Sequence, residues 1–94
     1  MTTHFIVHDK ADSVGVVVVE DLKPGMDATG WIMETDETIG LKSLEAVPLG
    51  HKIALQSLRV GDTVLKYGND VGRIVADVAK GSHVHVHNLK TKRW

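Results

Sequence analysis

The chain has 94 residues, which is enough for one small core, so we expect residues 1–94 to form a single domain. Lys and Arg number 11 against 12 Asp and Glu, and this balance argues against the basic surface that nucleic-acid binding requires. There is no cysteine, no apolar run of membrane-spanning length and no signal-peptide pattern in "MTTHFIVHDK". We therefore expect a cytoplasmic protein with neither nucleic acid nor a membrane as its partner.

Short segments rich in β-branched residues alternate with Gly, Pro, Asp and Asn, which predicts a mainly β fold. The near-continuous valines of residues 13–20 predict a strand buried on both faces, at the centre of the core. Residues 51–58 could form one or two helical turns. In chain order, the expected strands cover residues 3–8, 13–20, 29–34, 38–42, 63–68, 72–78 and 83–88.

The segments "DLKPGMDA", "SLRVGDTV" and "DVAKGSHV" share one spacing, with an apolar residue three positions before a glycine and a strand shortly after it. This spacing predicts tight turns in which glycine takes a positive φ. Several such turns in a short chain indicate bent hairpins folded over one another, and therefore a small β-clip or barrel-like domain.

Three histidines alternate with two valines in "HVHVHN", so a strand would place His83, His85 and His87 on one face. Neighbouring histidines would then lie roughly 6 to 7 Å apart, close enough for two imidazoles to share a metal ion, whereas the third would need a bulge. The same alternation is also typical of a strand with one solvated face, and the pattern alone leaves both interpretations open.

His51 and Lys52 follow a Pro-x-Gly turn in "PLGHKIAL", where a rigid scaffold can present side chains from a loop. Lysine supplies positive charge for a carboxylate or sulfonate, and histidine titrates near neutrality. A surface lysine after a turn is also common without any function. Tyr67 and Arg73 add a phenol and a guanidinium near similar turns.

The run "VPLGHKIAL", followed by "L..GD.V.KYG..VGR...D...G.HVHVHN", resembles the SAF-type domain of the altronate and galactarate dehydratase family. The resemblance extends from "VHDKADSVGV" to "HVHVHN" and implies the β-clip fold of that domain. Family members that dehydrate sugar acids usually carry it fused to a much larger catalytic region, so a stand-alone version implies a small subunit with a large catalytic partner.

Ser13 and Gly15 depart from the Asp-Asn-Val-Ala typical of the sugar-acid enzymes. The resemblance therefore favours the family's small subunits of a carbon–sulfur lyase, which eliminates sulfite from (2R)-3-sulfolactate to give pyruvate. A sugar-acid dehydratase subunit and a non-catalytic module that binds anions or carbohydrates are the alternatives. A third possibility is a purely structural brace for the large subunit.

The same resemblance implies a site that binds a small anionic substrate and a divalent metal, Fe(II) by preference, with Mn, Mg or Zn as alternatives. It implies His51 as a catalytic acid or base, His85 and His87 as metal ligands, with His83 left out. The substrate-binding candidates are Lys52, Asn88, Tyr67 and Arg73, and the candidates for contact with a large subunit are Trp31, Ile32, Met33 and Trp94.

Overall fold

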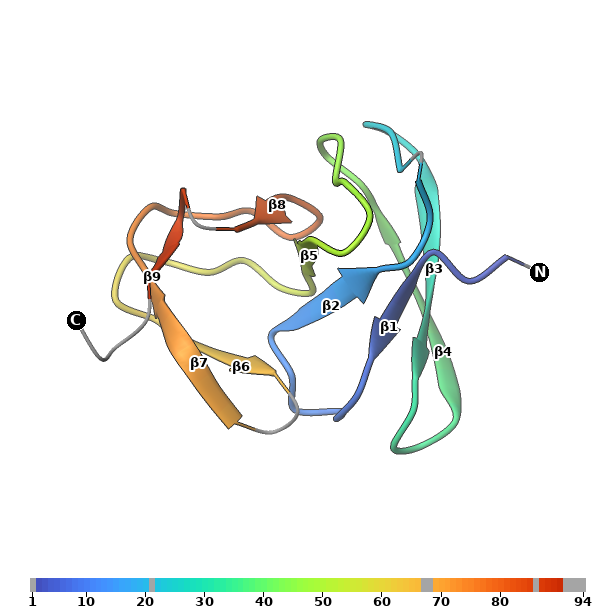
Figure 1. Cartoon of the computed structure of the whole chain (residues 1–94), viewed down its shortest axis with the longest axis horizontal. Helices are drawn as coiled ribbons and strands as arrows, with labels where there is room; N and C mark the ends of the chain where they lie inside the picture. The colour runs from blue at the N-terminus through green and yellow to red at the C-terminus, as the bar shows by residue number, and fades with distance from the viewer. Residues whose placement is uncertain (1, 21, 67–68, 86, 91–94) are drawn as a thin grey trace.

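The computed structural model describes residues 2–20, 22–66, 69–85 and 87–90, and every regular element within these ranges is a β-strand (Figure 1). The expected mainly β fold is confirmed, and none of the described residues belongs to a helix that could cross a membrane. The helical turns considered for residues 51–58 are wrong, because this segment opens with a strand. The strands are β1 (Phe5–Val7), β2 (Val14–Val17), β3 (Asp27–Ile32), β4 (Glu37–Lys42), β5 (Lys52–Ala54), β6 (Thr63–Lys66), β7 (Asn69–Ile74), β8 (His83–Val84) and β9 (Leu89–Lys90).

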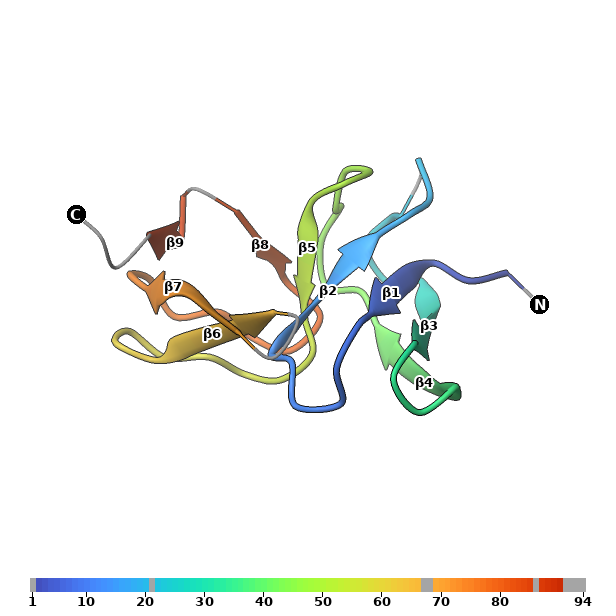
Figure 2. The same cartoon turned by 60° about the horizontal axis from the view of Figure 1, so that its bottom comes forward.

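The strands form two sheets, one of six strands in the order β4-β3-β1-β2-β5-β8 and one of three in the order β6-β7-β9. Neighbouring strands run antiparallel, except that β1 and β3 are parallel. Figures 1 and 2 show β3 and β4 at one end of the elongated molecule, β6, β7 and β9 at the other, and β2 and β5 between them. The middle of the molecule is therefore built by the strands that join its two ends.

Two apolar cores lie along this length, and β2 and β5 contribute to both. Val17 and Ile53 pack in the first core, whereas Val14 and Ala54 pack in the second. The valine-rich strand is thus buried on both faces as expected, although it covers only Val14–Val17. Because β8 pairs with β5, the histidines near β8 lie beside the strand that connects the two cores.

Four turns share one construction. Each starts at a buried apolar residue that forms an isolated bridge, either Leu22 with Val47 or Leu58 with Val78. The glycine three residues later has a positive φ, which is 82° at Gly25, 83° at Gly50, 94° at Gly61 and 89° at Gly81. The next residue donates its N–H to the carbonyl three positions back, as in a type II turn, in the pairs Met26–Lys23, His51–Pro48, Asp62–Arg59 and Ser82–Ala79.

The positive φ values expected in the three glycine segments are confirmed, and the Pro48–Gly50 turn is a fourth of the same type. The second and fourth turns lead directly into β5 and β8, which pair with each other. The two turns therefore bring His51 and His83, which are distant in sequence, close together in the sheet.

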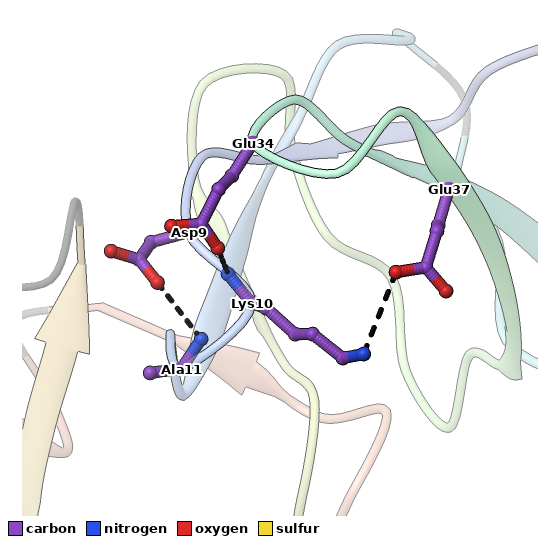
Figure 3. Close-up of polar contacts among 5 residues, drawn as sticks. All are labelled: Asp9, Lys10, Ala11, Glu34 and Glu37. Carbon is purple, nitrogen blue, oxygen red and sulfur yellow. Dashed lines mark hydrogen bonds and ion pairs between the residues drawn. The ribbon is translucent and has the colours of Figure 1, made fainter.

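A cluster of charged residues joins the β1–β2 connection to the β3–β4 hairpin (Figure 3). The Lys10 N–H donates to Glu34 Oε1 at 3.0 Å, and Lys10 Nζ lies 3.5 Å from Glu37 Oε1. The hydrogen bond with Thr35 lowers the pKa of Glu37, and the charge of Lys10 lowers it further. In Figure 1 this hairpin points to the opposite side from β8, so the cluster is remote from the histidines near β8.

Candidate metal and substrate site

Three histidines meet where β5 pairs with β8. The antiparallel register sets Ile53 opposite His83, so that His51 and His85 come opposite each other two residues further along. Residues directly opposite in a sheet share a face, and so do residues two apart in one strand. His51, His83 and His85, called the histidine trio below, therefore lie on one face, with ring centroids 3.8 Å apart for His51–His85, 4.9 Å for His51–His83 and 5.8 Å for His83–His85.

The three rings are stacked, and two of them are also joined by a hydrogen bond. His51 Nδ1 lies 2.7 Å from His83 Nε2, so one of these nitrogens carries a proton that the other accepts. Burial lowers the pKa of His83, and the neighbouring His51 and His87 lower it further against the opposing effect of Glu45. Burial, His51 and Lys52 lower the pKa of His85 in the same way. Both rings are therefore biased toward the neutral form, which is the form that binds metal.

The trio fits a divalent transition-metal ion. Its three potential ligand atoms lie within 4.8 Å of one another. In a tetrahedral site, two imidazole nitrogens bound to one ion at about 2.1 Å are roughly 3.4 Å apart, so a pair at the 4.8 Å limit would have to close by roughly 1.4 Å. Rotation of the half-buried rings would supply that movement, and three imidazoles are a donor set suited to zinc, iron or copper more than to magnesium.

The expected strand over residues 83–88 is interrupted, and this changes which histidines gather. β8 ends at Val84, a bend follows at His85, and His87 and Asn88 form a turn before β9. His87 is exposed, with its ring centroid 5.0 Å from that of His83 and tilted by 45°, whereas His83 lies inside the trio. Sequence reasoning left His83 out of the metal set because its side chain could equally be solvent-exposed; the structure brings His51, 32 residues away, into contact with it.

Two side chains hold the backbone that carries His83 and His85. Asn88, only 5% exposed, accepts the His85 N–H at Oδ1 (2.9 Å) and donates from Nδ2 to the His83 carbonyl (2.8 Å). Glu45, which sequence reasoning missed, accepts the His83 N–H at Oε1 (2.7 Å). The two hydrogen bonds to the described residues use one N–H and one lone pair of the Asn88 amide, and its expected role as a substrate ligand stays a prediction beside its observed role in holding the backbone.

The other expected site residues lie at different distances from the trio. Lys52 is half-buried on β5, opposite Val84, so strand alternation sets it on the other face of the sheet from the trio, although its charge acts on His85. Arg73 is exposed on β7 in the three-stranded sheet, opposite Thr63 and Lys90. Tyr67 lies outside the described residues.

The expected subunit contacts also divide. The prediction that Ile32 contacts a large subunit is wrong. Alternation along β3 points this side chain inward, and it is buried in the first core. Trp31 is half-buried and donates to Asp36 Oδ1 at 2.9 Å. Met33 is exposed at the hairpin, and Trp94 lies outside the described residues.

The fold and the sequence together define the class of domain. Residues 3–92 match the family described as the altronate/galactarate dehydratase SAF domain, and the chain belongs to this family. It is 50% identical to the (2R)-sulfolactate sulfo-lyase subunit alpha of Chromohalobacter salexigens over the whole of both chains. It is also 58% identical to the protein of the same name from Paracoccus pantotrophus, over 51% of this chain and 72% of that one.

Longer relatives contain the same domain as one part. The altronate dehydratase of Bacillus subtilis is 37% identical over 93% of this chain, but the match covers only 16% of the dehydratase. Most of that enzyme therefore lies outside the region that corresponds to this chain.

Proposed function

We propose that this chain is the small subunit of a cytoplasmic carbon–sulfur lyase that eliminates sulfite from (2R)-3-sulfolactate and leaves pyruvate. Full-length identity of 50% to a (2R)-sulfolactate sulfo-lyase subunit alpha is the observation that carries the proposal. The partner is a large catalytic subunit, and the enzyme is active only when the two chains are together. The trio, half-buried at the edge of the six-stranded sheet, is this chain's contribution to the shared site.

The proposed reaction begins with removal of the proton from the carbon that carries the carboxylate and the hydroxyl. The electron pair of that C–H bond forms a double bond to the neighbouring carbon, and the C–S bond breaks so that sulfite leaves with its own electron pair. The resulting enol tautomerises to pyruvate. The proton is weakly acidic, so the site must stabilise an enediolate and hold the leaving sulfonate in position.

The trio is proposed to bind the divalent ion, Fe(II) by preference and Mn, Mg or Zn as alternatives. Such an ion supplies Lewis-acid stabilisation of the negative charge on the substrate oxygens. His85 is retained as a ligand, and His51 and His83 join it because their nitrogens lie within 4.8 Å of one another. A ring nitrogen that binds metal has no lone pair for a proton, so the ligand role of His51 competes with the acid–base role expected for it.

The residues around the trio are proposed to hold the substrate. Lys52, whose charge reaches His85, is the anchor for the carboxylate or sulfonate. His87, exposed beside His83, is proposed to donate to the substrate instead of binding the metal. Arg73, Asn88 and Tyr67 remain candidate substrate ligands, of which Arg73 is in the other sheet.

The test is reconstitution of this chain with its large subunit, followed by addition of (2R)-3-sulfolactate. We expect sulfite and pyruvate in equal amounts, and neither product from the small chain alone. Lys52→Met should raise KM by at least about tenfold, since a hydrogen bond to a charged group contributes about 1.5–3 kcal/mol. Lys80→Met is the control, because Lys80 is an exposed lysine in the turn that leads into β8. Absence of sulfite from an intact, metal-loaded complex would refute the proposed reaction.

The second candidate is a small subunit of a sugar-acid dehydratase, and the match to altronate dehydratase over 93% of this chain favours it. The two enzymes would remove the same kind of proton but expel hydroxide or sulfite. Altronate and galactarate offered to the same complex distinguish them, because only a dehydratase forms 2-oxo-3-deoxy acids. A chain that binds anions alone, without metal or turnover, would instead be a binding module.

A further inference from the structure

An exposed apolar loop stands directly beside the histidine trio. This loop, residues 43–51 and called the β4–β5 loop below, has Leu44 and Leu49 exposed by 53% and 52%. Glu45 is the one charged residue in "SLEAVPLG", residues 43–50. The connection from β5 to β6 has a turn of the same type but includes Gln56, Arg59 and Asp62. The β4–β5 loop therefore has the composition of an interface centre, where charged residues are depleted.

The loop is attached to the strand that carries the trio. The Leu44 N–H donates to the Gly81 carbonyl at 3.0 Å, and the Glu45 carboxylate accepts the His83 N–H at 2.7 Å. At its other end, Leu49 lies two residues before His51. Figure 1 shows the loop rising beside β5 and β8, so a molecule seated on it would also cover the trio.

The loop is held in place although Leu44 and Leu49 face solvent. The Val47 N–H donates to the Leu22 carbonyl, the Gly50 N–H to the Val17 carbonyl and the Ser43 hydroxyl to the Glu45 carbonyl, at 3.2, 2.8 and 2.7 Å. A segment fixed before binding loses little conformational entropy when a partner docks. The apolar side chains are thus presented in a prearranged form.

Folding does not require leucine at position 49. The residue before the glycine is Pro24, Leu49, Val60 and Lys80 in the four equivalent turns, and all four are exposed. Because proline, valine and lysine occupy the same position in the other three turns, the turn itself does not require the exposed leucine near His51. Val60, 63% exposed in the other half of the molecule, is an equivalent position away from the trio.

We propose that the β4–β5 loop is the docking surface for the large subunit, which thereby covers the exposed side of the trio. The identity of the molecule that binds this surface is inferred from the altronate dehydratase of Bacillus subtilis. There the match to this chain covers only 16% of the enzyme, and the remaining part belongs to the same polypeptide. In a small subunit, a separate polypeptide takes the place of that remainder. The inference rests on the proposed function, because it names the surface through which the two subunits build their common site.

Hydrogen–deuterium exchange of this chain, alone and in the purified complex with its large subunit, tests the surface. We expect protection in residues 43–51 on complex formation and none in residues 56–63. Protection confined to other segments would overturn the docking surface while leaving the proposed reaction intact, provided that the complex releases sulfite. If residues 43–51 are instead protected when the small chain associates with itself, the surface binds a second copy of this chain. That result would also overturn the inference.

Two matched substitutions make the test quantitative. Leu49→Asp should weaken the complex by about tenfold or more, because it removes an apolar contact and would bury an unpaired charge in the interface. Val60→Asp places the same charge in an equivalent turn and should change the dissociation constant by less than about twofold. Circular dichroism should show both variants folded. Equal affinities for the two variants would overturn the inference, and failure of the wild-type chain to bind a large subunit would overturn the subunit function with it.

Discussion

A phenylalanine ring lies between two glycines and leaves no room for a side chain at either of them. A Cβ added at Gly15 would lie 2.7 Å from the Phe5 ring, and one added at Gly30 would lie 2.1 Å from it. Ser13, buried nearby, accepts the Leu65 N–H with its hydroxyl at 3.3 Å and donates its own N–H to the Leu65 carbonyl at 2.9 Å. Close packing against Phe5 thus accounts for glycine at position 15, and hydrogen bonds to the Leu65 backbone hold Ser13.

Gly15→Ala tests this packing. We expect a loss of about 1–3 kcal/mol in the free energy of unfolding, because the added methyl group overpacks a filled core. In the Gly15→Ala, Phe5→Leu double variant, the smaller side chain leaves room for the methyl group, so the combined loss should be smaller than the sum of the single losses. Urea denaturation of the four proteins measures the coupling, and strictly additive losses would contradict the contact.

The histidine pKa values predict how stability depends on pH in the metal-free chain. Burial and neighbouring charges hold the pKa of His83 and His85 below their usual value of 6.5, so the folded state binds fewer protons than the unfolded state in mildly acidic solution. The free energy of unfolding should therefore fall as pH drops below 6.5, and this loss should be complete below the folded-state pKa values. Above that window these two residues should contribute no slope.

Urea denaturation between pH 8 and pH 5, in the presence of a chelator, measures this dependence. The groups that act on the two rings are His51, His87, Lys52 and Glu45, and of these only Glu45 opposes the shift of His83. A variant with His83→Gln and His85→Gln should lose most of the slope between pH 6.5 and pH 5. An unchanged slope would assign the dependence to other groups.

At the scale of single elements, the sequence predicted strands and turns well because both are determined locally. β-Branched runs marked most strands, and the apolar-x-x-Gly spacing marked three of the four turns. The break after Val84 could not be predicted, because it depends on side-chain bonds from Asn88 to the backbone of His83 and His85. His83 was missed for a related reason, since its neighbour His51 is brought to it by pairing across 32 residues.

Asn88 is expected to position the metal-binding histidines, because it holds the backbone where strand β8 ends. Asn88→Ala removes the partner of the His85 N–H and of the His83 carbonyl, and should destabilise the fold by about 1–3 kcal/mol. It should also weaken metal binding by about 10–100-fold, the usual effect of losing a residue that orients metal ligands. Asn88→Asp retains an acceptor for the His85 N–H and should have an intermediate effect.

Isothermal titration with Zn²⁺, at a temperature where all variants are folded, separates the two effects of Asn88. If Asn88→Ala destabilises the chain but leaves metal affinity unchanged, its amide supports the fold only. Glu45→Gln is a useful comparison, because its amide oxygen can still accept the His83 N–H while the negative charge is removed.

At the scale of the whole molecule, the trio joins two chain segments that the strand order brings together only in the folded state. β5 lies between the two cores, and β8 is at the edge of the six-stranded sheet. A metal ion bound by His51 from one segment and by His83 and His85 from the other would bind the folded chain much more tightly than the unfolded one. Metal binding should therefore stabilise the entire fold.

The expected size of this stabilisation follows from mass action. At a free metal concentration about 100 times Kd, the gain is about 2.7 kcal/mol, which corresponds to a rise in Tm of roughly 10–20 °C for a domain of this size. Thermal unfolding with Zn²⁺ and, under anaerobic conditions, Fe²⁺ measures it. His83→Ala and His85→Ala should abolish most of the rise, whereas His87→Ala should retain it because that ring is exposed outside the trio. A rise that needs His87 but not His83 would instead support the ligand pair expected from the sequence alone.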